Sequence, residues 1–418
     1  MKANIISIGD ELLIGQTTNT NASFIGNQLS EININVTKVV TVGDDENAII
    51  DAFETAFAKA DIAIVTGGLG PTHDDVTRTC VVKFFNSELV ENEEILEDIK
   101  SLFGKRNREV TEINKAQALV PEVAEPIRNA HGTAPGMWIE KDKRIFVIMP
   151  GVPYEMKAMM NDFVVPRLAE ILEGSKSKIK RSTLQTTGIP ESTLAERLGD
   201  LDELLEGGKL SFLPSIGGVR LRIEVEDEDE KAAKNKLSEI EQKIKSKVGR
   251  YIYGRDDETL EEVIARMLEE RQLKISTAES CTGGLIANRL TNISGSSNYF
   301  ERGVVCYSNA SKVEILRVDE DLVAEKGAVS MEVAMQMAEG VKSTSGSDIG
   351  ISVTGIMGPK GATTDKPVGL VYIGYCDDKV CTAKKHIFGN ERLLNKQRTM
   401  RAALDMVRKQ LLGISLDD

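Results

Sequence analysis

Hydrophobic and polar positions along the first part of the chain alternate between two periods, which predicts an α/β architecture. Between Asn4 and about Leu172, short apolar runs (NIISIG, NINVTKVVTVG, DIAIVTGG and RIFVIMPG) are separated by stretches with apolar residues at helical spacing, such as ENAIIDAFETAFAKA. Buried strands alternating with amphipathic helices are typical of a mostly parallel sheet with crossover helices. Ligands bind such sheets at the carboxyl ends of the strands. The loops GDELLIG, GGLGPTHDD and MPGVPYEM are therefore candidate binding regions.

The pattern changes twice after this segment. Between about Lys178 and Tyr253, a strand (RSTLQTTGI), a helix (PESTLAERLGDL), a second strand (VRLRIEVED) and a long charged helix predict a small α+β unit. From Thr259 onward the α/β alternation returns, and it ends in a hairpin (GLVYIGYCDDKVCTAKKHIF) and an amphipathic helix. We therefore predict two three-layer α/β domains with mostly parallel sheets, residues 1–172 and 255–418, joined by a small α+β domain, residues 173–254.

Charge and composition exclude several classes of protein. The net charge of −13 makes nucleic acid an unlikely partner, because phosphate neutralisation needs concentrated Lys and Arg. No apolar run approaches the roughly 20 residues of a membrane span. The N-terminus enters a strand-like pattern at once, which leaves no room for a signal peptide and predicts a cytoplasmic protein.

Cysteine and histidine usage limits the available chemistry. The five cysteines form no CxxC pair, so we expect free thiols, with Cys376 and Cys381 facing each other across the hairpin as packed residues. With only three histidines, a histidine-rich metal site is excluded. General acid or base catalysis would then rely mostly on Asp, Glu, Lys or Tyr.

Glycines and carboxylates meet at strand ends in the first segment. The glycines of GGLGPTHDDVT let a ligand approach the backbone closely, and the acids that follow suit a hard divalent cation beside a phosphate. The candidate phosphate contacts are Gly67, Gly68, Gly70 and Thr72, and the candidate metal ligands are Asp74, Asp75, Asp10 and Asp44.

A second candidate site lies in the C-terminal segment. The strand that ends in AESCTGG carries hydroxyls, a thiol and a carboxylate just where a helix begins, and a helix N-terminus presents free N–H groups to an anion or oxyanion. His386 is the one histidine here, on a hairpin strand, so a nucleophile needs another base, and a lysine of lowered pKa can serve.

These motifs carry a family resemblance. SIGDELLIG, TVGDD, GGLGPTHDDVT, GTAPGMW and MPGVPYEM resemble the molybdopterin-binding (MoaB/MogA-like) domain at the front of the CinA (competence/damage-inducible protein A) family. AESCTGGLIA, GSSNYFERGVVCYSNASK and SVTGIMGP resemble the C-terminal domain of that family. The middle unit resembles the KH-like linker domain of CinA proteins; because it has no GxxG loop for RNA, we expect it to act as a spacer or in dimerisation.

The resemblance implies a bifunctional enzyme of the pyridine nucleotide cycle. The N-terminal domain would hydrolyse ADP-ribose to AMP and ribose 5-phosphate with a divalent metal ion of unknown identity. The C-terminal domain would hydrolyse the amide of nicotinamide mononucleotide (NMN) without a cofactor, giving nicotinate mononucleotide and ammonia. A homodimer is expected. Two alternatives stay open, namely that only one domain is active, and that the protein is a non-enzymatic molybdopterin-binding or competence-linked interaction protein.

Residue roles follow from matching the C-terminal motifs. We expect Ser297 to be the nucleophile, with Ser280 as the alternative, Lys312 as general base and Tyr307 as proton relay or orienter. Cys281 is a further candidate nucleophile, since a thiol at a helix start has a lowered pKa. The expected substrate contacts are Thr354, Arg392 (where the family's GDR reads Asn-Glu-Arg) and the backbone N–H groups of Thr282, Gly283 and Gly284.

Overall fold

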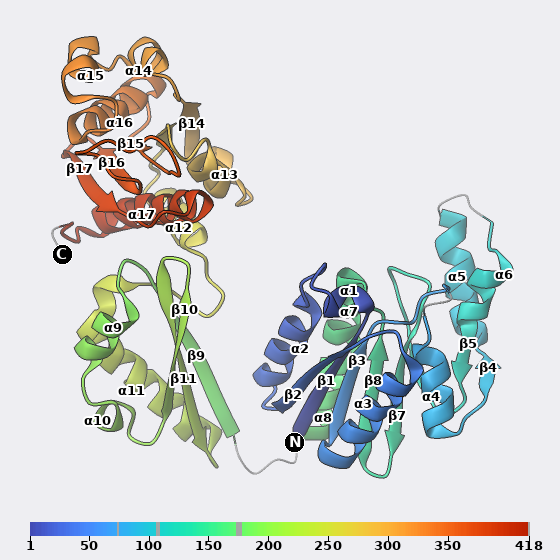
Figure 1. Cartoon of the computed structure of the whole chain (residues 1–418). Coiled ribbons are helices and arrows are strands. Elements are labelled where there is room, and N and C mark those ends of the chain that lie inside the picture. Colours follow the sequence, from blue (N-terminus) through green and yellow to red (C-terminus); the bar gives the residue numbers. More distant parts are fainter. Residues whose placement is uncertain (73–74, 106–108, 173–177, 417–418) are drawn as a thin grey trace. The chain divides into compact units, whose positions relative to one another are not determined.

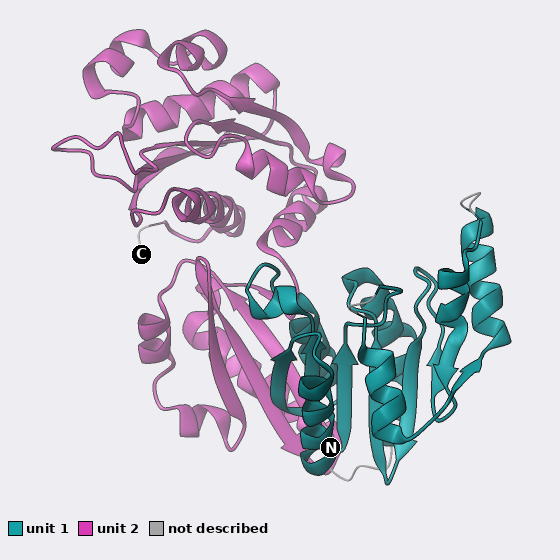
Figure 2. Ribbon diagram, turned by 45° about the vertical axis from the view of Figure 1, so that its right-hand side comes forward, with its two compact units in different colours: residues 1–176 teal, residues 177–418 magenta. Residues whose placement is uncertain are grey.

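The chain divides into two compact units, residues 1–176 and 177–418, each described by itself (Figure 2). The structure, a computed structural model, describes residues 1–72, 75–105, 109–172 and 178–416. Figure 1 labels the helices and strands along the chain. No helix in the described ranges is both long and apolar enough to cross a membrane.

The first unit is a three-layer α/β domain. Its six-stranded sheet has the order β2-β1-β3-β8-β7-β6. Strands β2, β1, β3 and β8 pair in parallel, whereas the β8–β7 and β7–β6 pairs are antiparallel. The strands are β1 (Lys2–Ile8), β2 (Asn35–Val42), β3 (Ile62–Thr66), β6 (Glu125–Ile127), β7 (Gly136–Lys141) and β8 (Arg144–Met149). Strand β3 is buried at every position, as expected for a central parallel strand covered on both faces.

Helices cover both faces of this sheet (Figure 1). One face packs against α2 (Thr20–Glu31), α7 (Pro153–Met159) and α8 (Val165–Leu172), the last two joined by a π-helical turn at Met160–Val164. The other packs against α3 (Glu46–Lys59) and α4 (Thr77–Phe85). The remaining elements are α1 (Asp10–Leu13), β4 (Leu89–Glu91), α5 (Glu93–Lys105), α6 (Glu112–Lys115), a 3-10 turn at Ala116–Ala118 and β5 (Leu119–Pro121).

The second unit starts with a small α+β domain. Its antiparallel sheet has the order β10-β11-β9-β12, and one apolar cluster joins the sheet to its helices. The elements are β9 (Lys178–Thr186), α9 (Glu191–Leu198), α10 (Leu201–Leu205), β10 (Lys209–Ser215), β11 (Gly218–Asp227), α11 (Glu230–Val248), a 3-10 turn at Gly249–Tyr251 and β12 (Ile252–Arg255).

The C-terminal domain is a second three-layer sandwich. Its five-stranded sheet has the order β14-β13-β15-β16-β17, in which β14, β13 and β15 are parallel. The strands are β13 (Ile275–Glu279), β14 (Phe300–Val305), β15 (Ile349–Gly355), β16 (Leu370–Cys376) and β17 (Cys381–Ile387). One face carries α12 (Leu260–Glu270), α13 (Leu285–Thr291) and α17 (Arg392–Leu412), and the other carries α14 (Asn309–Leu316), α15 (Glu320–Lys326) and α16 (Met331–Ser345). The predicted fold class is thus confirmed.

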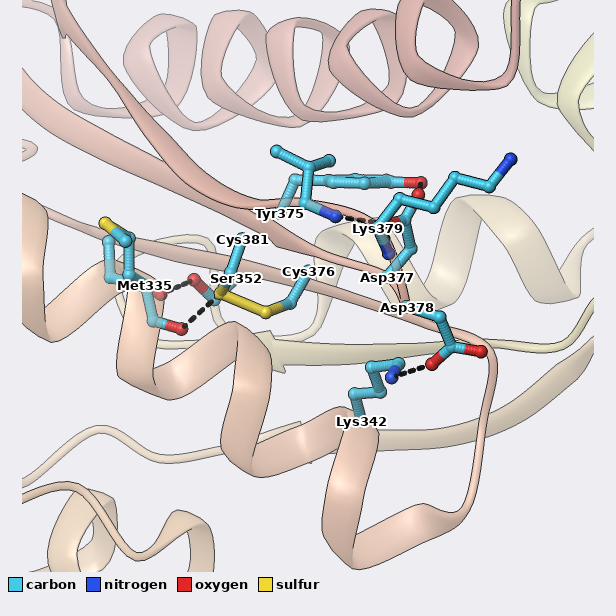
Figure 3. The surroundings of a disulfide bond; sticks show 11 residues. Met335, Lys342, Ser352, Tyr375, Cys376, Asp377, Asp378, Lys379 and Cys381 are labelled. Carbon is cyan, nitrogen blue, oxygen red and sulfur yellow. Dashed lines mark hydrogen bonds and ion pairs between the residues drawn. A yellow bond between two sulfur atoms is a disulfide. The ribbon is translucent and has the colours of Figure 1, made fainter.

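The hairpin cysteines differ from the prediction. Cys376 and Cys381 are joined by a disulfide rather than packed as free thiols (Figure 3). The register of β16 and β17 places the two residues directly opposite each other, and the Asp377 carboxylate closes the turn by accepting hydrogen bonds from the N–H groups of Lys379 and Val380. The other cysteines, Cys80, Cys281 and Cys306, are free and buried.

Candidate functional site

Ser280 and Lys312 meet at the carboxyl end of β13. The Nζ of Lys312 lies 3.1 Å from the Oγ of Ser280, and it also donates to the carbonyl oxygen of Cys306 at 2.9 Å. Both side chains are enclosed, with Lys312 only 1% exposed. Lys312 comes from the first turns of α14, and Ser280 is held in place by its backbone N–H, which donates to Val353 at the end of β15.

The environment of Lys312 makes its amine easier to deprotonate than that of an exposed lysine. Burial lowers the pKa of Lys312, because the charged ammonium group loses its hydration. No carboxylate in the described part of the chain forms an ion pair with it. A buried lysine of lowered pKa, in hydrogen-bond contact with a serine hydroxyl, has the geometry of a general base beside its nucleophile.

A buried carboxylate that the sequence did not single out organises the turn after Ser280. Glu279 is 1% exposed and accepts hydrogen bonds from the Thr282 hydroxyl at 2.7 Å and from the N–H groups of Gly284 (3.0 Å), Ile286 (3.0 Å) and Ala287 (2.8 Å). It therefore occupies the start of α13. The prediction that the Gly284 N–H binds substrate is wrong, since this group is already paired. The signal was present in the sequence, because a carboxylate directly precedes a glycine-rich helix start.

Removing the Glu279 carboxylate should destabilise this domain. In Glu279→Ala, three backbone N–H groups and one hydroxyl lose their acceptor in a dry site, at a cost of about 1–3 kcal/mol for each unsatisfied group. We expect a fall in melting temperature of roughly 8–16 °C, taking the lower value of about 1 kcal/mol for each of the four groups. Scanning calorimetry of the full chain measures it, with Glu270→Ala, an exposed acid on α12, as the control. Equal melting of both variants would contradict this role.

The cavity beside Ser280 is small and has mixed walls. Its volume is about 190 Å³, and its lining includes Ser280, Cys281, Tyr307, Lys312, Thr354 and Arg392. Thr354 donates its hydroxyl to the carbonyl of Ala328 at 2.8 Å. Tyr307 is 64% exposed, and its hydroxyl accepts a hydrogen bond from Arg392 at 3.3 Å. Tyr307 is thus placed to orient Arg392 at the cavity.

The predicted pairing of Ser297 with Lys312 is wrong. Ser297 lies in a 3-10 turn, Ser296–Asn298, before β14 begins, whereas Lys312 contacts the chain just after β14 ends. Strand β14 runs parallel to β13, so Ser297 is at the opposite end of the sheet from Ser280. At about 3.3 Å per residue, the six residues of β14 separate the two ends by roughly 20 Å. Ser280 is the hydroxyl in contact with Lys312.

The expected activation of Cys281 is also contradicted. The thiol is 5% exposed, and burial raises its pKa to about 12, which outweighs the nearby backbone N–H groups. The start of α13 does not lower the pKa of Cys281, because the Glu279 carboxylate already accepts hydrogen bonds from the free N–H groups of that helix end.

A larger cavity lies at the carboxyl edge of the first sheet. Its volume is about 960 Å³, and it combines most of the predicted N-terminal residues: Asp10, Asp44, Gly67, Gly68, Gly70 and Asp75. The lining also includes Glu11, which follows the first strand beside Asp10, and Glu155, which was not predicted. Glu155 lies in the quoted MPGVPYEM stretch, is buried, and accepts a hydrogen bond from Asn129 at 2.7 Å.

Negative charges gather in this cavity. Burial, together with the neighbouring carboxylates of Asp10, Glu11 and Asp75, raises the pKa of Asp44 despite a hydrogen bond from the Asp10 N–H. Asp75 accepts hydrogen bonds from both the N–H and the hydroxyl of Thr72, so Thr72 shapes the loop.

Glycine is required at two of these positions because the protein's own atoms lie close to the backbone. A Cβ on Gly67 would lie 2.1 Å from the carbonyl oxygen of Ile8, and one on Gly70 would lie 2.6 Å from the Asp75 carboxylate. Asp74, a predicted metal ligand, lies outside the described residues. Within those residues, no three His, Cys, Asp or Glu side chains are spaced to hold a metal ion by themselves. Magnesium is commonly held by one or two carboxylates together with substrate phosphates, so a cation at this cavity would take part of its ligands from a bound substrate.

Three protein-family models match the chain. The probable molybdopterin binding domain matches residues 4–170, the damage-inducible protein CinA KH domain matches residues 181–254, and the CinA C-terminal domain matches residues 257–411. A putative competence-damage inducible protein of Caldicellulosiruptor saccharolyticus is 45% identical over 413 residues, covering 99% of this chain and 100% of that protein. A CinA-like protein of Chloroherpeton thalassium is 47% identical over 420 residues, covering 98% and 99%.

Solved structures match single domains. The structure of the protein CinA with unknown function from Thermoplasma acidophilum is 36% identical and covers 39% of this chain and 95% of that chain, with a TM-score of 0.37. A molybdopterin biosynthesis protein from Mycobacterium abscessus is 20% identical and covers 41% and 94%, with a TM-score of 0.29.

Proposed function

The chain belongs to the CinA family, and from this premise we propose that its C-terminal domain is a serine–lysine amidohydrolase that converts NMN to nicotinate mononucleotide and ammonia. The observation that carries the proposal is the buried contact of 3.1 Å between the Ser280 hydroxyl and the Lys312 amine. The amine also donates to the carbonyl oxygens of Cys306, Tyr307 and Ser308, which hold it beside the Ser280 hydroxyl.

The reaction would proceed in two steps. The neutral amine of Lys312 takes the proton of Ser280 as the Ser280 oxygen attacks the amide carbon, and the same proton passes to the departing ammonia. Water then attacks the acyl-serine, and Ser280 recovers its proton as the carboxylate leaves. Cys281 lines this cavity beside Ser280, and its N–H donates to no oxygen in the described part of the chain. We assign this N–H to the oxyanion.

The cavity is consistent with a substrate of which only the reacting end is enclosed. A volume of about 190 Å³ accommodates the nicotinamide ring but not the ribose and phosphate with it. These parts would project toward the mouth, where Arg392 is held by the Gly358 carbonyl at 3.0 Å and by Tyr307. A guanidinium group binds phosphate well, so Arg392 is the expected phosphate contact.

Ammonia release from NMN by the purified full chain tests the proposal. We expect turnover of NMN and weak turnover of nicotinamide riboside, which lacks the phosphate for Arg392. Absence of ammonia release from folded protein would contradict the amidohydrolase. Tight retention of molybdopterin without turnover by either domain would support the non-enzymatic alternative instead.

We further propose that the N-terminal domain hydrolyses ADP-ribose to AMP and ribose 5-phosphate with a bound divalent cation. The cavity of about 960 Å³ is large enough for a dinucleotide-like substrate, and Gly67, Gly68 and Gly70, which carry no side chains, are part of its lining. The cation would neutralise charge on the diphosphate. Without a cation, the acids that surround Asp44 would repel a phosphate substrate.

Removing the charge of Asp75 should abolish this activity. Asp75→Asn keeps an oxygen acceptor for Thr72 but loses the carboxylate, so we expect AMP formation to fall at least about 100-fold with the loop preserved. Chelation of divalent cations should have the same effect in the wild type. Asp51→Asn, an exposed position on α3, is the matched control. Full activity in Asp75→Asn, or in chelator, would refute the cation-dependent reaction.

A further inference from the structure

A third cavity lies within the second unit, apart from the Ser280 pocket. It has a volume of about 660 Å³ and is bounded by turns of the small α+β domain and by β17 and α17 of the C-terminal domain. The turns approach α17 closely, since a Cβ on Gly217 would lie 2.5 Å from Cδ of Arg401 and one on Gly188 would lie 3.1 Å from the Asp405 carboxylate. This volume is within the range of small-molecule sites.

The cavity is rich in cations although the chain as a whole is acidic. Lys384, Arg398, Arg401 and Lys409 line it, against the acids Glu191 and Asp405. Asp405 is already engaged, because its carboxylate oxygens lie 2.8 Å from Arg408 and 3.1 Å from Lys409. Asp405 therefore does not balance the positive charges of Arg398 and Arg401.

The two arginines have unused donors. Arg398 is half-buried and has no hydrogen-bond or ion-pair partner in the described part of the chain. Arg401 uses Nη2 for the Thr186 carbonyl (3.3 Å) and the Tyr253 hydroxyl (3.2 Å), but its Nε is buried without a partner. Arg398 and Arg401 are three residues apart on α17, so they repel each other across one helix face. An anion between them would satisfy the donors and remove the repulsion.

Part of the lining suits an aromatic ring. His386 and Phe388 line the cavity and are stacked, with ring centroids 5.5 Å apart and planes at 12°. Burial, with the nearby charges of Lys384 and Lys409, lowers the pKa of His386 to about 4, so its imidazole is neutral at pH 7. Neutral aromatic surfaces stack with nucleobases.

We propose that this cavity binds a nucleotide, with its phosphate on Arg398 and Arg401 and its base against the His386–Phe388 wall. The site is distinct from both proposed catalytic centres. It is connected to one of them through α17, which begins at Arg392 in the Ser280 pocket and continues to Arg398 and Arg401 in this cavity. The nucleotide is therefore placed as an effector of the amide hydrolysis, and the binding claim itself is independent of any turnover.

Photolabelling locates the site directly. The full chain in chelator is irradiated with 8-azido-AMP, and labelled peptides are mapped by mass spectrometry. We expect label within residues 186–219 or 384–409, in addition to any label in the N-terminal cavity. Arg398→Glu should lower the label in these segments at least tenfold. Lys385→Glu, an exposed position on β17 that does not line the cavity, should leave it unchanged.

Competition and a second variant complete the test. Unlabelled AMP should protect these segments, while adenosine or inorganic phosphate alone should protect them poorly. Arg398→Gln removes the charge with a smaller disturbance of the side chain, and it should lose label as well. This second variant guards against a loss of label in Arg398→Glu that is caused by a folding defect. Label confined to residues 1–176, label as strong as that of the wild type in either Arg398 variant, or full protection by phosphate alone would overturn the nucleotide site.

Discussion

Ser280→Ala should abolish ammonia release from NMN, lowering kcat/KM at least about 10³-fold, as expected when a covalent nucleophile is removed. Ser280 is the hydroxyl in contact with Lys312, and its side chain lines the cavity in which the amide would react. The loss should appear in kcat rather than in substrate affinity, because the Arg392 contact is unaffected. The fold should persist, since only one hydroxyl group is lost.

Two matched variants make this test decisive. Ser297→Ala should keep nearly full activity, because Ser297 lies before β14, at the other end of the sheet. Cys281→Ser should stay within about threefold of the wild type, since its thiol is held protonated by burial. An active Ser280→Ala protein, or an inactive Ser297→Ala protein that is correctly folded, would contradict the serine–lysine assignment.

Lys312→Met should lower kcat/KM for NMN about as much as Ser280→Ala does. It should also remove the pH dependence of kcat/KM that the lysine causes. The base must be the neutral amine, so wild-type kcat/KM should rise with pH up to the pKa of Lys312 and then level off. Because burial lowers that pKa, the plateau should begin below pH 10.5, the ordinary value for lysine. Below the plateau, activity should fall about tenfold for each pH unit. A profile flat from pH 6 to 10 would argue against a lysine base.

Lys312→Arg separates the base from a fixed positive charge. A guanidinium group is not deprotonated in proteins, so the variant keeps the charge but cannot accept a proton. We expect it to be as inactive as Lys312→Met, and substantial activity would instead indicate electrostatic stabilisation. Lys312→Met removes the donor to the Cys306 carbonyl, at a cost of about 1–3 kcal/mol, and Lys312→Arg places a larger group in the same buried site, so melting curves must accompany the kinetics.

The elements of the fold were predictable because their patterns are strong. Fully apolar runs such as β3 and the capping box that starts α12 at Thr259 specify strand and helix locally. Short edge elements such as β4 and β5 were not predicted, since three-residue strands carry no period of their own. The disulfide depended on the exact register of β16 and β17, which the turn at Asp377 determines and composition does not.

The sequence predicted which regions form the candidate sites but not which side chains contact one another there. Strand ends and glycine turns pointed to Ser280, Asp44 and Asp75, because polar residues at such positions are rarely needed for packing, whereas Lys312 was singled out by the family resemblance of its motif. Which serine meets Lys312 depended on strand direction: β14 carries the chain from one end of the sheet to the other between Ser297 and Lys312. Glu279 was overlooked because a carboxylate that binds its own backbone looks the same in sequence as one that faces a ligand.

The hydrogen bonds of α17 have a consequence for anyone who wishes to produce the amidohydrolase in isolation. Arg408 donates to the carbonyl oxygens of Arg250 and Ile252, and Arg401 donates to that of Thr186. A gene truncated between β12 and α12 would leave these guanidinium groups facing water along a helix that also carries the apolar residues Ala402 and Met406. Expression of such a fragment should give poorly soluble material, whereas a fragment starting before β9 retains the acceptors and should remain in solution.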